Sequence, residues 1–407
     1  MKKVGLIGMF GINNAGDNLE AMATKFLLEK QLKDVDISCF SINLSTMSRT
    51  LLGKQRMGSL ECVTKPAYLE KEEFWNTIYD LDALIMGGGG ILLPIPECDP
   101  ILLYGSHINI KRVPKTAWNA VGSNWAPLND RKLLGWYSKI KEAVEILDYV
   151  SIRSITTQRL LERSGCMPEK INRVPSLVTA MELDQPELLS ELETKYGIHK
   201  NQRLIGISIG PEITRNPLDK FINALAKTIN EIQTNLSEDY KIIVFPVGEM
   251  YGDGAACRML GELCPDSCVV AKELTATQVW LLIGRLDAYL SMRYHGVVSA
   301  IAQSVPTLVL DCYLSNETLG SKLRDLVWDS ELEEFYFSPI IEICGDPLFR
   351  NFDRVPQTNN ISMRLKERIM SLLTPEVKNR WQVVTQKQKA KALDHLQMMI
   401  RALEIDK

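Results

Sequence analysis

The sequence predicts an α/β protein with two Rossmann-like halves, each a parallel sheet covered by helices, and a helical segment after them. Short apolar runs alternate with amphipathic segments, which is the pattern of strands buried between helices. A polar stretch at residues 177–202 interrupts this alternation once, and the pattern then begins again. A chain of 407 residues has room for two or three domains. We predict domains at residues 1–185 and 200–345 and a helical segment at 356–407.

The first half is predicted to start with a buried strand, because residues 4–9 are apolar and lead into a turn rich in Gly and Asn. Apolar runs of similar length predict further strands at residues 35–40, 83–86 and 149–152. Amphipathic spacing predicts helices at 19–32 and 130–147, and a shorter helix at 156–163. The polar stretch between the halves contains one more helical pattern, at 187–196.

The second half repeats the alternation. Its apolar runs predict strands at residues 204–209, 242–247, 268–271, 288–292 and 307–310. Helices are predicted between them, for example at 218–233 and 277–285. After Pro356 the pattern becomes helical at 361–373 and 376–403. Apolar residues at helical spacing in the last helix indicate a packing face rather than a site.

Composition excludes several classes of protein. Lys and Arg number 47 and Asp and Glu 50, so the net charge is −3, and no basic face for a nucleic-acid partner is expected. A hydrophobic fraction of 45% is enough for sizeable cores and excludes a disordered chain. Residues 1–10 resemble a signal peptide, but the segment after them is a poor cleavage region. We therefore expect a cytoplasmic protein.

The cysteines do not predict a metal site or a disulfide framework. Their number, nine, is odd, and their spacing is irregular, as expected for reduced thiols. Cys257, Cys264 and Cys268 are the densest group, but they are widely spaced and have no nearby His as a fourth ligand. We expect no metal and no cofactor.

Ligands of open parallel sheets bind beyond the carboxyl ends of the strands, so the segments that follow the strands are the candidate sites. After the first strand, glycines let the backbone approach a ligand, and the next helix offers free N–H groups. The alternative is a tight turn with Asp17 or Asn18 as the helix N-cap. Four consecutive glycines after the strand at 83–86 indicate backbone that lies against a ligand or another chain segment. The candidate residues in these two segments are Asn14, Gly16, Asp17, Asn18, Gly88 and Gly89.

Charged residues follow two other strands. Arg153 ends the strand at 149–152, where it could hold a carboxylate or phosphate or form a surface ion pair. Arg293 and His295 follow the strand at 288–292. Residues two apart in an extended segment point to the same side, so we expect both to face one pocket, the Arg as anion holder and the His as proton carrier. A structural hydrogen bond is the alternative role for His295. Asp253 is a candidate general base or helix cap.

Together these motifs resemble the polysaccharide pyruvyl transferase family. The resemblance covers about residues 1–312 and rests on segments in the family's order: Asn-Asn-Ala-Gly-Asp-Asn at 13–18, Asp-Ala-Leu-Ile-Met-Gly-Gly-Gly at 82–89, Ser-Ile-Arg-Ser at 151–154 and Met-Arg-Tyr-His-Gly at 292–296. Four positions depart from the pattern. In the opening segment, Asn13 stands where the family usually has Gly, and Asn18 where it has an acidic residue. Farther along the chain, Gly210 stands where the family has Arg, and Gln278 where it has Glu. Arg215 in the next loop could replace the missing Arg.

The resemblance implies a GT-B-like fold with an interdomain cleft and transfer of pyruvate from phosphoenolpyruvate to a sugar of a cell-surface or exopolysaccharide precursor, as a ketal. It implies that His295 protonates the donor and that Arg293 and Arg153 bind its charged groups. We add Arg215 and Gly296 on the donor side, and assign the acceptor to Asn14, Gly16, Asp17, Asn18, Gly88 and Gly89 of the first half.

The expected acceptor is a saccharide or a lipid-linked saccharide, and the second of these would bring the protein to a membrane surface as a peripheral protein. Two alternatives remain open. One is a GT-B-type glycosyltransferase or a nucleotide-sugar epimerase, because the fold alone does not separate these enzymes. The other is a catalytically silent binding protein in glycan synthesis, which the departures at Gly210 and Gln278 favour.

Overall fold

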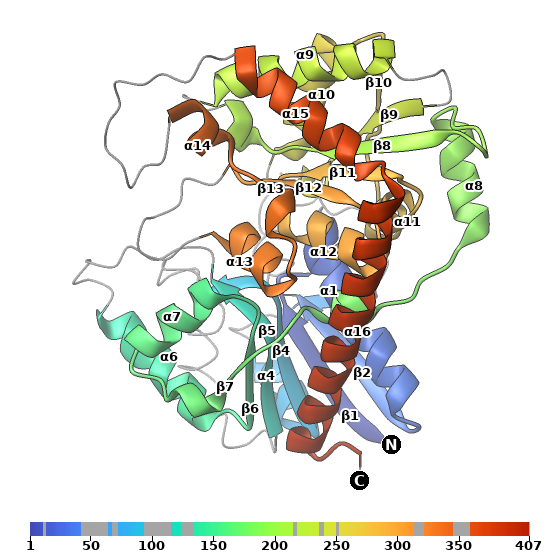
Figure 1. Cartoon of the computed structure of the whole chain (residues 1–407). Coiled ribbons are helices and arrows are strands. Elements are labelled where there is room, and N and C mark those ends of the chain that lie inside the picture. Colours follow the sequence, from blue (N-terminus) through green and yellow to red (C-terminus); the bar gives the residue numbers. More distant parts are fainter. Residues whose placement is uncertain are drawn as a thin grey trace.

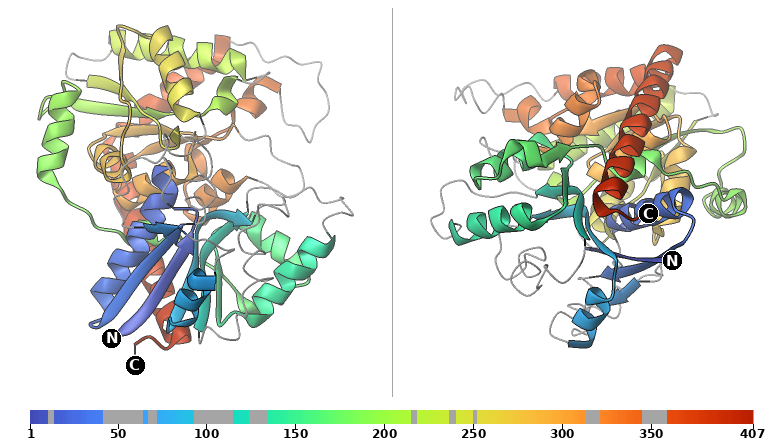
Figure 2. Two further views of the ribbon diagram at one scale, coloured as in Figure 1. Left: turned by 180° about the vertical axis from the view of Figure 1, so that it is seen from behind. Right: turned by 90° about the horizontal axis from the view of Figure 1, so that it is seen from below.

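The computed structural model describes residues 1–10, 14–41, 64–66, 72–92, 115–123, 134–214, 218–235, 240–249, 252–312, 321–344 and 359–406. They form two parallel sheets that lie one above the other in Figure 1, with helices around and between them. The two ends of the chain lie at the same end of the molecule, as the views of Figure 1 and Figure 2 agree. The predicted architecture of two parallel α/β halves is confirmed.

The first sheet has the strand order β3-β2-β1-β4-β5-β6-β7, with every neighbouring pair parallel. Its apolar central strands are buried on both faces, which is why they read as continuous apolar runs. The strands are β1 (Lys2–Gly8), β2 (Val35–Ser41), β3 (Thr64–Pro66), β4 (Ala83–Leu92), β5 (Lys115–Ser123), β6 (Tyr149–Ile152) and β7 (Ile171–Arg173). The helices of this half are α1 (Ala15–Gln31), α4 (Glu72–Tyr79), α6 (Leu134–Ile146) and α7 (Ile155–Arg163).

Helix α8 (Pro186–Lys195) lies in the polar segment between the halves. The second sheet has the order β10-β9-β8-β11-β12-β13 and is also parallel. Its strands are β8 (Arg203–Ser208), β9 (Tyr240–Val244), β10 (Cys268–Val270), β11 (Ala288–Ser291), β12 (Thr307–Leu310) and β13 (Tyr336–Phe337). Its helices are α9 (Asp219–Asn235), α10 (Asp253–Leu263), α11 (Ala276–Gly284), α12 (Tyr294–Ala302), α13 (Lys322–Asp329) and α14 (Pro339–Cys344). Helices α15 (Asn359–Leu372) and α16 (Pro375–Leu403) complete the described chain.

The predicted strands are confirmed within a few residues, but the sequence missed four others. Three of them, β3, β7 and β13, are short strands at sheet edges, and the fourth, β5, lies inside the first sheet between β4 and β6. Asn119 interrupts the apolar run of β5, and Ala120 has a φ of 46°. The register with both neighbouring strands shifts around this point. The glycine run also differs from expectation, because β4 continues through it to Leu92. The N-terminal residues of the predicted helix at 130–147 lie outside the described residues, and α6 begins at Leu134.

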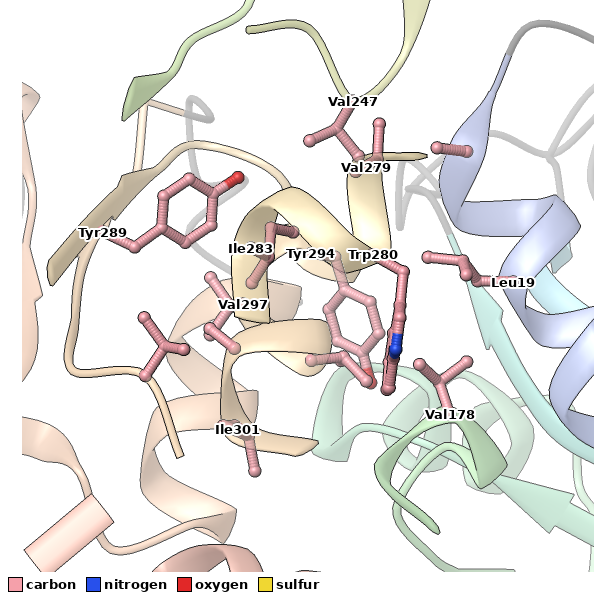
Figure 3. Packing of buried hydrophobic residues seen from close by; sticks show 14 of the residues in the cluster. Leu19, Val178, Val247, Val279, Trp280, Ile283, Tyr289, Tyr294, Val297 and Ile301 are labelled. Carbon is pink, nitrogen blue, oxygen red and sulfur yellow. The ribbon is translucent and has the colours of Figure 1, made fainter. Parts of the chain in front are cut away.

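One hydrophobic core joins the two halves. Figure 3 shows Leu19 of α1 and Val178 facing Trp280 of α11, with Tyr294 of α12 beside it. All of these side chains are buried, and the Trp280 indole donates a hydrogen bond to the Leu183 carbonyl at 3.2 Å. Burial of each large apolar side chain stabilises the fold by about 1.5–3 kcal/mol. The halves are therefore packed together through α1, α11 and α12.

Helix α16 runs from the second sheet down to the first and packs against β5, β6 and α12 (Figure 1). Thr374 caps its N-terminus by accepting a hydrogen bond from the Val377 amide. The buried face contains the predicted packing residues Leu396, Met399 and Leu403. Helix α16 thus belongs to both halves.

A chain of hydrogen bonds connects α16 with the first half. The buried His395 ring lies between the Tyr149 hydroxyl, 3.0 Å from Nδ1, and Asn119 Oδ1, 2.9 Å from Nε2. Asn119 donates to the Thr24 hydroxyl at 3.0 Å, and this hydroxyl donates to the Glu20 carbonyl at 2.7 Å. Burial lowers the pKa of His395 to about 4, against the opposing charge of Glu20. The ring is therefore neutral at physiological pH, with a hydrogen on Nε2 for Asn119.

The burial of His395 makes the stability of the folded protein depend on pH. The unfolded chain protonates His395 near its ordinary pKa of 6.5, whereas the folded protein does so only near 4. The unfolded state binds more protons between these values, so the free energy of unfolding falls by up to about 3 kcal/mol as pH drops through this window. We expect His395→Gln to remove this part of the slope in urea unfolding between pH 7 and pH 4.

His199→Gln is the matched control, because His199 is exposed and its loss should leave the slope unchanged. An equal slope in the wild type and in His395→Gln would contradict the prediction.

Candidate functional site

The N-terminus of α1 lies against the second half of the molecule. Asn14 is its N-cap, and the Asn14 side chain accepts a hydrogen bond from the Gly16 amide at 3.1 Å. Asp17 and Asn18, the N-caps of the alternative interpretation, lie inside the first turn instead. The Ala15 amide donates to the carbonyl of Val247, beyond β9, at 2.9 Å. The end of α1 is thus bonded to the backbone of the other half.

His295 lies in the first turn of α12 and packs on this end of α1. A Cβ at Gly16 would clash with the imidazole atoms Nδ1 and Cγ, so only glycine permits this approach. Only 9% of His295 is exposed to solvent. The imidazole is therefore held at the interface between the halves, with Nδ1 toward α1.

Arg153 reaches the same imidazole from the first half. It lies at the junction of β6 and α7, where Ser154 caps the helix. Arg153 Nη1 is 3.1 Å from His295 Nε2, and the guanidinium carbon lies 4.1 Å from the centroid of the Tyr294 ring. Because an arginine only donates, His295 Nε2 is the acceptor in this contact. The buried Arg153 is not a surface ion pair, and 4% of it is exposed.

Two carboxylates on one face of α1 complete this cluster. Glu20 Oε1 lies 3.5 Å from His295 Nε2 and 3.8 Å from Arg153 Nη1. Burial alone would raise the pKa of Glu20, but the proximity of His295 and then the charge of Arg153 outweigh it and lower that pKa. Burial raises the pKa of Asp17, against the opposing electrostatic effects of His295 and Arg153. We call His295, Arg153, Glu20 and Asp17 the imidazole cluster.

Arg293 turns away from the imidazole cluster toward acids of its own half. Its Nε lies 3.0 and 2.9 Å from the two carboxylate oxygens of Asp253, and its Nη1 lies 3.0 Å from Glu212 Oε1. Burial raises the pKa of Asp253, against the hydrogen bonds and charge of Arg293. We call Arg293, Asp253 and Glu212 the arginine cluster.

The sequence predicted that Arg293 and His295 would face one pocket, and the structure gives them different partners. The reason is local: Arg293 is the extended N-cap of α12, but Tyr294 and His295 are helical, so the rule for extended residues does not apply. The departure at Gly210 also has a local reason. A Cβ there would clash with the guanidinium of Arg293, so a glycine makes room for the arginine cluster.

Lys322 interacts electrostatically with residues of both clusters and was not predicted from the sequence. Burial lowers its pKa to about 8, as do the charges of Arg153 and Arg293, while Asp17 and Glu212 oppose this shift. Lys322 therefore interacts electrostatically with members of both clusters. It is the first residue of α13, after the N-cap Ser321. The signal in the sequence was a Ser before an amphipathic segment, a typical helix start, which carries no functional meaning alone.

The other predicted residues lie nearby or in structural positions. Gly89 has a φ of 136°, and a Cβ there would be 2.8 Å from Asp17 Oδ1, so this part of β4 lies behind Asp17. Asn18 is half-buried on α1, and Gly88 is within β4. Gly296 faces β11, where a Cβ would be 2.6 Å from Ser291 Oγ. Arg215 lies outside the described residues.

The departure at Gln278 has a structural role. Its side chain accepts from the Thr275 amide at 3.0 Å, and its amide donates to the Thr275 hydroxyl at 3.2 Å, which closes a capping box at the start of α11. Among the residues that the structure describes, no group of three His, Cys, Asp or Glu side chains could hold a metal ion. Likewise, no helix in the described segments is long and apolar enough to cross a membrane.

The family is decided by comparison of the sequence. The profile of the polysaccharide pyruvyl transferase family matches residues 14–312. The chain belongs to this family. The match includes α1, the junction of β6 and α7, and the start of α12, so the imidazole cluster is built from segments of the family's matched region. No curated protein matches the chain in sequence.

Solved structures with the same fold are distant in sequence. A putative UDP-N-acetylglucosamine 2-epimerase from Listeria monocytogenes has 11% identity and a TM-score of 0.55, covering 99% of this chain and 97% of that one. Anabaena Alr3699/HepE in complex with UDP and glucose has 10% identity and a TM-score of 0.53, covering 99% and 100%. ADP-heptose lps heptosyltransferase II from E. coli has 12% identity and a TM-score of 0.50, covering 92% and 98%. These likenesses confirm the predicted GT-B-like fold, and identities this low show the fold alone.

The close approach at Gly16 predicts that a single methyl group disrupts the site. We expect Gly16→Ala to lower the free energy of unfolding by about 1–3 kcal/mol, because the added Cβ must displace the His295 ring or separate the halves. Urea unfolding measures the effect. Gly135→Ala on α6 is the control, since a Cβ there meets nothing within 4 Å and a helical alanine is favourable. Equal stability of the two variants would contradict the prediction.

The half-buried ammonium of Lys322 predicts a stability cost that depends on pH. The unfolded chain keeps this lysine charged up to its ordinary pKa of 10.5, whereas the folded protein releases the proton near 8. The unfolded state therefore binds more protons in this window, and the cost of the buried charge is fully present below pH 8. We expect Lys322→Met to be more stable than the wild type by about 1–3 kcal/mol at pH 7, and by less at pH 10.

Thermal unfolding at the two pH values is the measurement, with Lys200→Met as an exposed control that should change neither value. A lower stability of Lys322→Met at pH 7 would show that the ammonium is fully compensated by its neighbours.

Proposed function

We propose that the protein transfers the pyruvyl group of phosphoenolpyruvate to two hydroxyls of a saccharide, forming a ketal and releasing phosphate. The observation that carries the proposal is the His295 imidazole, held at the interface of the halves beside Arg153, with Lys322 within electrostatic reach of the cluster. Membership of the polysaccharide pyruvyl transferase family supports it. The donor is an enol phosphate with a carboxylate, so its site needs concentrated positive charge.

In this proposal, Arg153 and Lys322 are the cations that bind the anionic donor first. The guanidinium of Arg153 can bind a carboxylate or phosphate through two parallel hydrogen bonds. Lys322, with a pKa near 8, is available as an ammonium at neutral pH, and a bound anion would favour that form. Arg293 already binds Asp253 and Glu212, so its charge is largely offset. Its proposed role as a donor-binding residue requires one of these acids to move.

His295 is the proton donor of this proposal. In the structure, His295 Nε2 accepts from Arg153 and has no room for a proton. When Arg153 turns to the anionic donor, Nε2 is freed and can take up a proton from solvent. That proton then passes from Nε2 to the methylene carbon of phosphoenolpyruvate, which makes the central carbon electrophilic for a sugar hydroxyl. The second hydroxyl displaces phosphate from the same carbon and completes the ketal.

The acceptor is proposed to lie at the N-terminal end of α1, where Asn14, Asp17 and Gly89 meet. The raised pKa of Asp17 suits a base that takes the hydroxyl proton. Asp253 was the predicted base, but its oxygens bind Arg293 and the Gly248 amide. We therefore prefer Asp17 for this step. The acceptor would be a saccharide or a lipid-linked saccharide, and the latter implies peripheral association with a membrane.

The glycosyltransferase alternative needs a nucleotide diphosphate site in the second half. The helix N-terminus after β9 is the natural place for a phosphate group in such a sheet. At the start of α10, however, the Glu249 carboxylate lies where a Cβ on Gly254 would be, and Asp253 follows Gly252 there. Asp253 is paired with Arg293, but the Glu249 carboxylate at this position repels a diphosphate, which favours the pyruvyl transfer proposal.

Phosphate release from phosphoenolpyruvate, measured with a panel of saccharide acceptors, tests the proposal. We expect His295→Ala to lower kcat by about 10²- to 10⁴-fold while donor binding persists. Arg153→Ala should instead raise the KM for phosphoenolpyruvate by about 10- to 100-fold, because a charge-assisted contact is lost.

Arg159→Ala, on the exposed face of α7, is the control and should retain full activity. Nucleotide release from a nucleotide sugar, with no phosphate from phosphoenolpyruvate, would favour the glycosyltransferase alternative. No turnover of either donor by a folded wild-type protein would favour the silent binding protein.

A further inference from the structure

We propose that Glu20 is a positioning residue that holds the protonated His295 ready to act. The inference rests on the proposed function, since it gives Glu20 a role through His295. Glu20 lies on α1, one turn after Asp17, and its exposed fraction is 0%. Its place in the sequence indicates no role, because one acid in a helix is usually part of a solvated face.

The first observation is the cost of this carboxylate. Neither Glu20 oxygen has a hydrogen-bond partner of good geometry, and both are buried. A buried charge whose ion-pair partners lie no closer than 3.5 Å costs stability, and an apolar side chain of similar size would stabilise the core instead. Its pKa is nevertheless lowered, so the carboxylate is ionised at neutral pH. A residue kept at such a cost indicates a function other than stability.

The second observation is the position of the Glu20 carboxylate relative to His295 and Arg153. Glu20 Oε1 is 3.5 Å from His295 Nε2 and 3.8 Å from Arg153 Nη1, while these two nitrogens are 3.1 Å apart. The three groups form a triangle in which the contact of Arg153 with the imidazole is shorter than that of Glu20. At 3.5 Å, the contact between Glu20 and the imidazole is too long for a strong hydrogen bond. It becomes favourable only when Nε2 carries a proton.

These contacts describe two states of the cluster. In the ligand-free state, Arg153 donates to Nε2, and Glu20 offsets the charge of Arg153. When an anionic donor draws Arg153 away, Nε2 takes a proton from solvent, and the new N–H faces the Glu20 carboxylate and the donor. The proton then leaves Nε2 for the methylene carbon, the ring becomes neutral, and Arg153 can return. Glu20 stays ionised throughout and supplies the fixed negative charge that lets the imidazolium exist beside two cations.

The charged and titratable groups around this pair come from several elements. Asp17 of α1 adds a second negative charge, whereas Lys322 of α13 adds a positive one. Tyr294 of α12 presents its ring edge-on to the imidazole, and His395 of α16 is neutral. Within this set, Glu20 is the acid that approaches Nε2 directly.

The test uses Glu20→Gln, which keeps the shape of the side chain and removes its charge. We expect kcat for phosphate release to fall by about 10- to 100-fold, with a much smaller change in the KM for phosphoenolpyruvate. The alkaline limb of the kcat profile should also move to lower pH, because the imidazolium loses its counter-charge. Glu20→Asp, which restores the charge, should recover the position of that limb.

Glu29→Gln, on the exposed side of α1 where it pairs with Lys25, should change neither kcat nor the profile. A purely structural role of Glu20 would lower the amount of folded enzyme but leave the pH profile unmoved. Full kcat and an unchanged profile in Glu20→Gln would overturn the inference and leave the proposed function standing. If Glu20→Gln fails to fold, Glu20→Met, which replaces the charge by an apolar side chain of similar size, decides: an alkaline limb displaced to lower pH supports the inference, and a profile equal to that of the wild type overturns it.

A ligand-free measurement separates the inference from the proposed function. The chain has four His, so the imidazole ¹⁵N signals of the labelled protein can be assigned with a His295→Ala reference. As the pH is lowered, a proton competes with Arg153 for Nε2, and the His295 signals should therefore change at a lower pH in Glu20→Gln than in the wild type. If wild-type protein releases no phosphate but this difference is present, the proposed function fails and the coupling of Glu20 to His295 stands. If the difference is absent, the coupling itself is wrong.

Discussion

The insertion of the first turn of α1 between the two halves is the constraint on which the site depends. The Ala15 amide is bonded to the Val247 carbonyl, and Gly16 admits the His295 ring against the helix. Any side chain at position 16 would push this ring away or hold the halves apart. Because Arg153 and His295 come from different halves, their contact exists only when the halves dock this closely. The Thr156 amide, which donates to Asp325 at 2.7 Å, joins the same two halves nearby.

The balance of charge at this interface is unusual for a protein interior. Arg153, Lys322 and Arg293 are buried or half-buried cations, and Glu20, Asp17, Glu212 and Asp253 are acids close to them. Burial of so many ionisable groups costs stability even when they are paired. Such a cost is typical of sites where charge must be redistributed during binding, since an arriving anion can replace an internal partner. The apolar core that Leu19 and Trp280 share offsets part of this cost.

The sequence predicted the fold from apolar runs, and this worked where a strand was uninterrupted, as in β6 and β12. It failed for β5, because Asn119 and the positive φ of Ala120 break the pattern in a strand that is nonetheless buried. Strand ends located Arg153 and His295 correctly, since local pattern determines where a strand stops. Their contact spans 142 positions and depends on how the halves dock, which no local pattern encodes. Glu20 was not predicted for a similar reason, because its neighbours come from α12 and the end of β6.

Helix α16 limits how the two halves can separate. It packs on the first sheet with one end and beside the second with the other, and its His395 is bonded into β5 and to β6 (Figure 1). A rotation that opened the interface without unfolding this helix would have to keep α16 packed against at least one of the two sheets. The axis of such a rotation would therefore pass close to α16, and the groups farthest from it would travel the greatest distance.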